Sequence, residues 1–339
     1  MPRSPLELTR AQILAFRRRV GALDERLPRG ARSLRRAAWA GLTDSVPRAA
    51  LLSIHARVEG AKPSSWEDPS LVQVWGPRFS VYVVAARDRA VFTLGRLPQD
   101  ARRRARAEDM ARRLHAFVAG RRLKDNEAQR GLGVGNMVKY AAPTGTVLIR
   151  WEGARAPDLW TVPPPEVAPS DARRALVRRY LHILGPGTPE SFALWAGVRD
   201  VEAHPTFDAL RKSLTAVRTP VGEAWILARD EPGFREPPGA PAAARLLPSG
   251  DSFWMRWGAE RELIVPDTRT RALLWTPRVW PGAVLVEGEI VGTWRRTNAV
   301  VEISPWQKLA PAQKQAVEAE ALSFPLPGLI GRMVVKWLQ

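Results

Sequence analysis

Hydrophobic and polar positions follow two different periods along the first 235 residues, and their order predicts helices followed by hairpins. The stretch LTRAQILAFRRRVGAL places Leu8, Ile13 and Phe16 near helical spacing, and PRAALLSIHARV follows it. Two-residue alternation rich in Val, Ile, Thr and aromatic residues, broken by Gly, Asp or Pro, predicts strand–turn–strand units. These units cover residues 78–98, 146–163 and 214–232.

The same order recurs in the second and third parts of this region. The second hairpin follows the helical stretch DARRRARAEDMARRLHAFVAG and a shorter one around LGVGNMVKYAA. Before the third hairpin lie three helical stretches: one opening at Pro169-Ser170-Asp171, one in TPESFALWAG, and one in DVEAHPTFDALRKSL. In TPESFALWAG, Thr188 is predicted to cap the helix and Pro189 to begin it.

Helices followed by a hairpin are typical of a winged helix, in which a helix-turn-helix has a β-hairpin beside it. We therefore predict an α+β protein with three tandem winged-helix domains. Their predicted bounds are residues 1–97, 98–165 and 166–235. A plain α+β domain with three unrelated hairpins is the alternative.

The pattern changes after residues 235–245, REPPGAPAAAR, whose Pro, Ala and Gly content suits a domain boundary. Short strands are predicted in RELIVPD, RALLWTP, AVLVEGEIVGTWRR and AVVEISP, with a turn at Glu287-Gly288-Glu289. A helix is predicted over 311–322, and the tail RMVVKWLQ as a strand. We assign residues 245–339 to a small antiparallel β-barrel with a C-terminal helix and tail.

The net charge of the chain indicates what kind of partner it binds. The formal net charge is +18, and only seven of the 52 basic residues are lysines. Arginine binds phosphate through two parallel hydrogen bonds, so this excess favours double-stranded DNA as the partner. A codon bias towards arginine would explain why Arg is used in place of Lys, but it need not make the basic residues outnumber the acidic ones.

Other features exclude several classes of site. With no cysteine there are no disulfides and no thiolate metal sites, and the four histidines lack metal-ligand spacing. No apolar run approaches the roughly 18–20 residues that cross a bilayer, and the N-terminus lacks the apolar core of a signal peptide. We expect a cytoplasmic monomer without a cofactor, a metal or a membrane partner.

Five stretches, in this order, resemble the winged-helix DNA glycosylases. They are GLTDSVPRAALL, DPSLVQVWGPRFSVYVV, YLHILGPGTPESFALWAG, ARLLPSGD and VEGEIVGTWRR. That family includes enzymes that remove alkylation adducts and unhook interstrand crosslinks, together with uncharacterised relatives. The resemblance implies three winged helices and a β-barrel around a DNA channel. It also implies hydrolysis of the N-glycosidic bond of bulky or cationic alkylpurines.

The chain departs from the family at the catalytic motif. Catalytic members carry Gln-apolar-Gln, or a close variant, just before a helix start like Pro47-Arg48-Ala49-Ala50. Thr43, Asp44 and Ser45 occupy those three positions here. Neither glutamine is present, and the middle residue is acidic where the family is apolar.

Two interpretations of these three residues stay open. A cationic N7-alkylpurine leaves readily, so the site must mainly place a water and stabilise positive charge, which the Asp44 carboxylate could do with help from Thr43 and Ser45. Alternatively, Asp44 or Ser45 caps the following helix. The protein would then be a non-catalytic duplex binder, either a lesion sensor or a regulator.

Candidate DNA contacts come from arginines in or near the matched stretches, with a solvated surface position as the alternative for each. They are Arg48, Arg57, Arg78, Arg295 and Arg296. His55, on the helix after the turn, is a weaker candidate for a general base.

Overall fold

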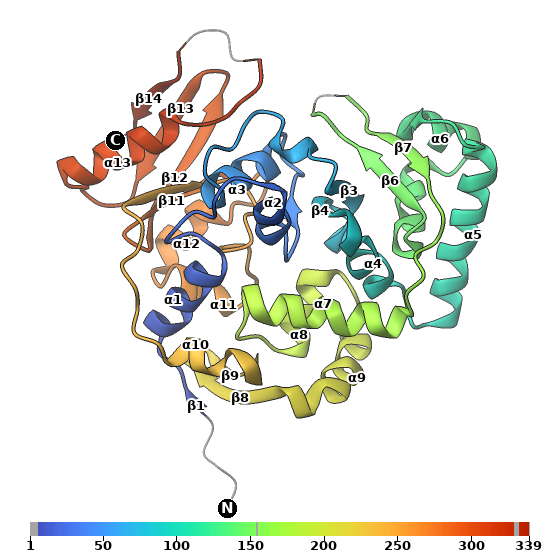
Figure 1. Ribbon diagram of the computed structural model, residues 1–339, viewed down its shortest axis with the longest axis horizontal. Helices are drawn as coiled ribbons and strands as arrows, with labels where there is room; N and C mark the ends of the chain where they lie inside the picture. The colour runs from blue at the N-terminus through green and yellow to red at the C-terminus, as the bar shows by residue number, and fades with distance from the viewer. Residues whose placement is uncertain (1–5, 154, 329–331, 339) are drawn as a thin grey trace, which may run out of the picture.

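The computed structural model describes residues 6–153, 155–328 and 332–338, and it shows a mixed α+β protein (Figure 1). Within these residues the strands form three sheets, with the orders β1-β8-β9, β2-β4-β3-β6-β7-β5 and β10-β11-β12-β13-β14. The predicted α+β class is confirmed. The first five residues of the first predicted domain and the end of the predicted tail, Gln339, lie outside the described residues.

The N-terminal part contains a hairpin, but it is not the one predicted over residues 78–98. Its elements are α1 (Arg10–Val20), α2 (Ala31–Ala37), β2 (Leu42–Thr43), α3 (Ala49–Arg57), β3 (Leu71–Trp75), β4 (Val81–Ala85) and α4 (Arg89–Phe92). The antiparallel partner of β4 is the earlier strand β3, so the strand predicted after residue 86 is wrong. Ala90, Leu94 and Leu97 have helical spacing and pack with Ala107 and Ala172, which is why this segment is helical.

The second predicted hairpin is confirmed, and it joins the same sheet as β3 and β4. Its part of the chain contains α5 (Ala101–Val118), β5 (Leu123–Lys124), α6 (Asp125–Leu132), the 3₁₀ helix η5 (Gly135–Thr144), β6 (Val147–Arg150) and β7 (Asp158–Thr161). Strands β6 and β7 pair from Val147↔Thr161 to Arg150↔Asp158. Gln73 of β3 pairs with Ile149 of β6. The first two hairpins therefore share a six-stranded sheet, and the count of three winged helices is not confirmed.

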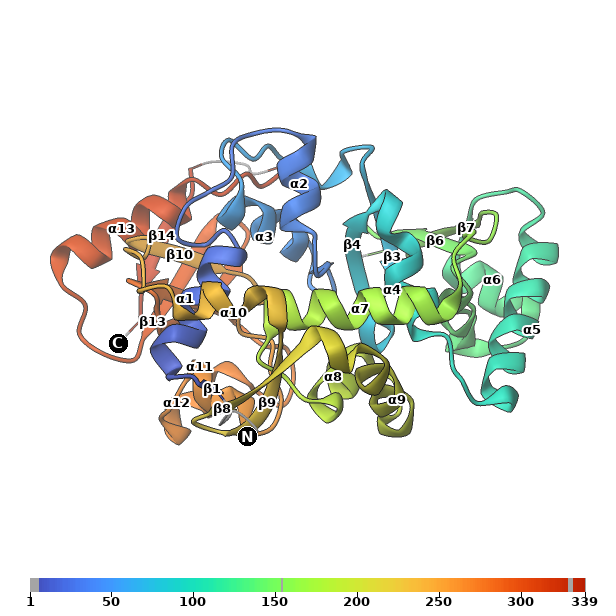
Figure 2. The same ribbon diagram turned by 60° about the horizontal axis from the view of Figure 1, so that its bottom comes forward.

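The third hairpin forms as predicted, in a separate sheet. The elements are α7 (Pro169–Leu184), α8 (Pro189–Ala196), α9 (Asp200–Leu210), β8 (Leu214–Thr219), β9 (Gly222–Leu227) and α10 (Glu231–Arg235). Strand β1 (Leu6–Glu7) adds to β8 in parallel. Helix α7 crosses the middle of the molecule (Figure 2), and its Leu176, Tyr180 and Leu184 belong to a large buried core.

The cap predicted at Thr188 is confirmed. The Thr188 hydroxyl accepts a hydrogen bond from the Ser191 backbone at 3.2 Å, and the Ser191 hydroxyl accepts one from the Thr188 backbone at 2.8 Å. Pro189 occupies the first turn of α8. This reciprocal pair satisfies two backbone N–H groups that the helix itself leaves unpaired.

We expect Thr188→Ala to lower the free energy of unfolding by about 0.5–2 kcal/mol, because the cap hydrogen bond is lost. Urea denaturation measures this change. The control is Thr188→Ser, which keeps the hydroxyl and should stay close to the wild type. Equal losses in the two variants would show that the hydroxyl is not what stabilises α8.

The C-terminal part confirms the hairpin and the last helix but corrects two strands. Its elements are β10 (Ala244–Leu247), α11 (Glu260–Ile264), α12 (Thr268–Leu274), β11 (Gly282–Val286), β12 (Glu289–Thr297), β13 (Val300–Pro305), α13 (Pro311–Leu322) and β14 (Val334–Trp337). RELIVPD and RALLWTP form helices α11 and α12, not strands. Asp267 caps α12 by accepting from the backbone of Arg269 and Thr270, which commits that short segment to a helix.

The predicted closed barrel is not confirmed. In the part of the chain that the structure describes, the C-terminal sheet is open, with β10 and β14 at its edges. Strand β14 is the predicted tail strand, and it pairs in parallel with β13, so the sheet is not purely antiparallel. No helix in the described ranges is both long enough and apolar enough to cross a membrane.

Candidate active site at the turn before helix α3

Thr43 ends strand β2, and Asp44 and Ser45 lie in the turn between β2 and α3. Thr43 pairs with Tyr82 of β4, and the Asp44 backbone N–H donates to the Val81 carbonyl at 2.8 Å. Helix α3 begins at Ala49, after Arg48 has turned the chain with a left-handed backbone of φ 69°. The pairing with β4 thus holds the turn at the edge of the six-stranded sheet.

The Asp44 carboxylate is buried and fully engaged. Asp44 is only 1% exposed. Oδ1 accepts a hydrogen bond from the Ala50 backbone at 3.0 Å, and Oδ2 accepts one from Nε2 of Gln73 at 2.7 Å. Asp44 therefore caps α3 and ties the start of that helix to strand β3.

Gln73 extends this connection to the second hairpin. Its Oε1 accepts from the Trp151 backbone N–H at 2.7 Å, directly after β6. The loop beyond Trp151 also adjoins the turn, since a Cβ placed on Gly153 would lie 3.3 Å from Cβ of Pro47. The sequence analysis missed Gln73, whose signal is a single polar residue within the apolar strand LVQVW.

Burial changes the acidity of this carboxyl. Desolvation raises the pKa of Asp44 to about 7. The hydrogen bonds from Ala50 and Gln73 and the charges of Arg48 and Arg150 act in the opposite direction, but burial outweighs them. A carboxyl with this pKa exchanges a proton near neutral pH, as a general base must.

The other two residues of the turn face different surroundings. Thr43 is buried and packs on Gly250, where an added Cβ would lie 2.9 Å from Cγ2 of Thr43. Ser45 is exposed. The three predicted residues are neighbours in the chain, but only Ser45 presents its side chain to solvent.

Two arginines lie beside the turn and stack on one tryptophan. The guanidinium carbon of Arg48 is 4.4 Å from the ring centre of Trp66, and that of Arg150 is 3.9 Å from it. Arg150 also forms an ion pair with Glu67 at 2.7 Å. The structure thus keeps the predicted Arg48 at the site and adds Arg150, which the sequence analysis missed.

The prediction that Arg57 contacts DNA is wrong. Arg57 is 2% exposed, and its two terminal nitrogens donate to the two carboxylate oxygens of Asp251, each at 2.7 Å. Ser53 donates to the same carboxylate at 2.7 Å. Helix α3 is buried along its whole length, so Arg57 on its last turn needs a buried counter-charge instead of a phosphate.

The remaining predicted contacts lie on other elements. Arg78 is exposed beyond β3, donates to the Leu194 carbonyl at 3.1 Å and lies over Trp257. Arg295 and Arg296 lie on β12 of the C-terminal sheet, where Arg295 is exposed and Arg296 is half-buried. Within the described ranges, no hydrogen bond or ion pair joins these three residues to the Asp44 turn.

His55 does not take part in the Asp44 turn. Its Nε2 lies 3.1 Å from the Ser323 hydroxyl after α13, and burial, together with nearby Arg26 and Arg245, lowers its pKa to about 4. Among the residues that the structure describes, no group of three or more His, Asp or Glu side chains is arranged to hold a metal ion.

Comparison with known proteins places the chain in a DNA glycosylase family. The model of the family described as DNA glycosylase AlkZ-like matches residues 35–324, and the chain belongs to this family. The resemblance noted in the sequence is thereby confirmed.

The chain is similar to two glycosylases, one by sequence and one by structure. The chain is 24% identical over 210 residues to a Streptomyces sahachiroi protein named interstrand DNA cross-link repair glycosylase. That match covers 60% of this chain and 52% of the relative, so the chain spans about half the length of the curated relative. The solved structure of Streptomyces sahachiroi DNA glycosylase AlkZ superposes with a TM-score of 0.78 at 17% identity, over 98% of this chain and 100% of that one, and it shows the same fold.

Proposed function

We propose that this protein binds double-stranded DNA and hydrolyses the N-glycosidic bond of bulky or cationic alkylpurines. The observation that carries the proposal is the buried Asp44 carboxyl, with its pKa raised to about 7, in the turn where the resemblance places the catalytic motif. Family membership and the repair role in the relative's name support a glycosylase-like activity.

The chemistry suits a carboxylate. When the bond between the sugar C1′ and a positively charged alkylpurine breaks, the electron pair leaves with the purine and neutralises it. The sugar then carries positive charge until a water oxygen attacks C1′. Ionised Asp44 stabilises that charge and accepts the proton of the water. The Ser45 hydroxyl is exposed on the solvent side of the turn.

A specific observation favours a second candidate function. Asp44 is 1% exposed, and both of its oxygens already accept hydrogen bonds from the protein. A carboxylate in this state acts as a helix cap. The protein would then be a non-catalytic binder of duplex DNA, a lesion sensor or a regulator on a glycosylase scaffold.

Base release decides between the two. The assay follows free purine liberated from a duplex that carries N7-alkylguanine, with duplex binding measured in parallel by anisotropy. Release by the wild type supports the glycosylase. Tight duplex binding without release, on both small and bulky N7-alkyl adducts, supports the binder.

The charge of the chain predicts how duplex binding responds to salt. If about six phosphates are neutralised, log K should fall with log salt with a slope of about −5. Replacing Arg295 and Arg296 together by Gln should make the slope shallower by about 2 if both contact phosphate. A slope near zero for the wild type would show that the +18 charge does not serve DNA binding.

Several finer expectations stay predictions. They are the division into winged helices at 1–97, 98–165 and 166–235, the C-terminal domain at 245–339, the monomeric state and the cytoplasmic location.

A further inference from the structure

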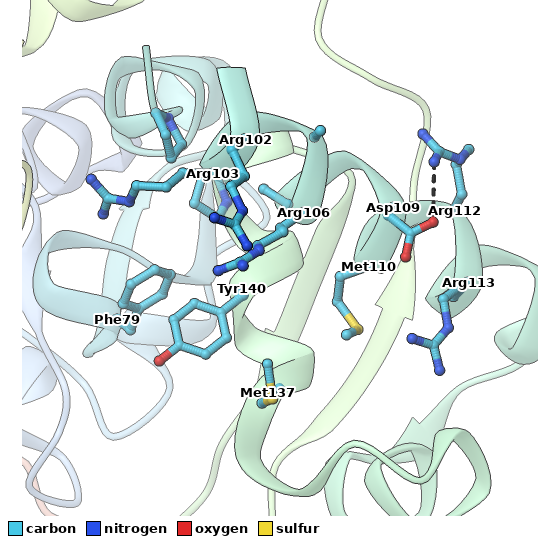
Figure 3. Close-up of a pocket in the computed structure, with 14 residues that line it drawn as sticks. Phe79, Arg102, Arg103, Arg106, Asp109, Met110, Arg112, Arg113, Met137 and Tyr140 are labelled. Atoms are coloured by element: carbon cyan, nitrogen blue, oxygen red, sulfur yellow. Dashed lines mark hydrogen bonds and ion pairs between the residues drawn. The ribbon is translucent and has the colours of Figure 1, made fainter. Parts of the chain in front are cut away.

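A groove on the far side of the molecule from the C-terminal sheet is independent of the Asp44 turn. It has a volume of about 840 Å³, which is within the range of ligand sites. It runs along α5, which lies at one end of the molecule in both views (Figures 1 and 2), and η5 forms its other side. Figure 3 shows the side chains that line it.

The rim of the groove is strongly basic. Arg102, Arg103, Arg106 and Arg113 of α5 all line it. Its acidic lining residue, Asp109, is already paired with Arg112 at 3.1 Å, the contact drawn as a dashed line in Figure 3. The groove therefore carries a net positive charge and suits a polyanion.

The floor of the groove is apolar and aromatic. Phe79 and Tyr140 meet edge to face, with ring centres 5.0 Å apart, and Met110 and Met137 continue the surface. Tyr140 is 43% exposed and Met137 is 51% exposed, which is unusual for such large apolar side chains. In Figure 3 the Arg106 side chain points toward Tyr140, so a cation and an aromatic ring lie at the same end of the groove.

Phe79 is held in this position at a cost in backbone strain. Arg78 and Phe79 both have left-handed backbones, with φ values of 57° and 56°. Non-glycine residues adopt this conformation at the expense of stability, and such strain concentrates at binding sites. The buried guanidinium of Arg96 lies 4.8 Å from the Phe79 ring and packs it in place.

We infer that this groove binds single-stranded DNA, with a base stacked on the Tyr140 side and phosphates on the α5 arginines. A duplex hides the faces of its bases and offers nothing to an aromatic floor, whereas every unpaired base has a face to stack. An acidic peptide would satisfy the arginines but leave the aromatic and thioether surface without a planar partner. The inference rests on the proposed function in taking DNA as the partner, and it adds a second site for unpaired nucleotides.

The test uses an undamaged, labelled oligodeoxynucleotide of about 12 nucleotides, a length within the usual range of single-strand sites. Anisotropy gives its Kd for the full-length protein and four variants. Tyr140→Ala should weaken binding about 5- to 150-fold, the usual effect of losing one stacked base, while Tyr140→Phe should stay close to the wild type. Arg106→Gln should make the salt slope shallower by about 0.7.

The matched control is Arg104→Gln. Arg104 lies on the same helix and carries the same charge, but it faces away from the groove and pairs with Glu108 at 2.8 Å. Its replacement should change the Kd much less than Arg106→Gln does. Equal losses for the two variants, or unchanged binding in Tyr140→Ala, would overturn the inference. Displacement of the oligonucleotide by an equal concentration of a polyglutamate peptide would overturn it in favour of a protein partner.

The readouts separate this site from the proposed function. The probe contains no lesion and no bond is broken, so failure of base release leaves the binding result intact. Conversely, if the protein releases bases but its affinity for single-stranded DNA does not depend on Tyr140, the groove proposal fails and the glycosylase proposal stands.

Discussion

Replacing Asp44 by Asn is expected to slow base release from N7-alkylguanine DNA by about 10²- to 10⁴-fold, the usual contribution of a general base. The amide keeps an oxygen for the Ala50 backbone but cannot accept the proton of the attacking water. Single-turnover release of the free purine measures the effect. Unchanged release in Asp44→Asn would remove Asp44 from the chemistry.

A double variant separates catalysis from capping. In Asp44→Asn the new amide N–H₂ faces the Gln73 N–H₂, so one hydrogen bond is lost and the fold is weakened. Adding Gln73→Glu restores an acceptor for that new amide and leaves an oxygen for the Trp151 backbone. We expect the double variant to regain stability without regaining base release. Recovery of both would mean that a carboxylate at position 44 is not required for base release.

The acidity of Asp44 sets the pH dependence of the same reaction. Since burial raises its pKa to about 7, the ionised form is a minority below pH 7. The single-turnover rate should therefore rise about tenfold per pH unit below 7 and level off above it. A rate independent of pH between 5 and 8 would contradict the role of Asp44 as a base.

The largest loss of stability is expected from breaking the buried pair of Arg57 and Asp251. Arg57→Ala should lower the free energy of unfolding by about 3–5 kcal/mol, because the Asp251 carboxylate is left buried without its counter-charge. Urea denaturation followed by circular dichroism measures the loss. The control is Arg104→Ala, which breaks an exposed pair with Glu108 and should cost about 0–1 kcal/mol.

The pair also predicts how the protein responds to acid. Burial opposes ionisation of Asp251, but the charge and hydrogen bonds of Arg57, with Ser53 and the Phe253 backbone, outweigh it and lower its pKa. A lowered pKa in the folded state means that the stabilisation is present above the unfolded value and is lost as the pH falls below about 4. In Arg57→Ala this acid sensitivity should shrink. Equal stability losses for Arg57→Ala and Arg104→Ala would contradict the buried pair.

Local patterns in the sequence were enough to predict many elements. The hairpins at 146–163 and 214–232, the cap at Thr188 and the helix over 311–322 each depend on neighbouring residues, and the structure confirms them. Errors came where a short apolar run suits either a helix or a strand. Residues 86–96 and the segments RELIVPD and RALLWTP became helices because they pack on other helices or carry a cap.

The sequence by itself determined the α+β class, the basic charge, the family and the place of the Thr43–Ser45 turn before a helix, because each depends on composition or on residues close in the chain. The tertiary structure alone decided what those residues do. It buried Arg57 against Asp251 and Asp44 against Gln73, brought Arg150 beside Arg48, and joined two hairpins into one sheet. Each of these contacts links positions far apart in the chain. Burial, counter-charges and acidity follow from such contacts, and no local pattern encodes them.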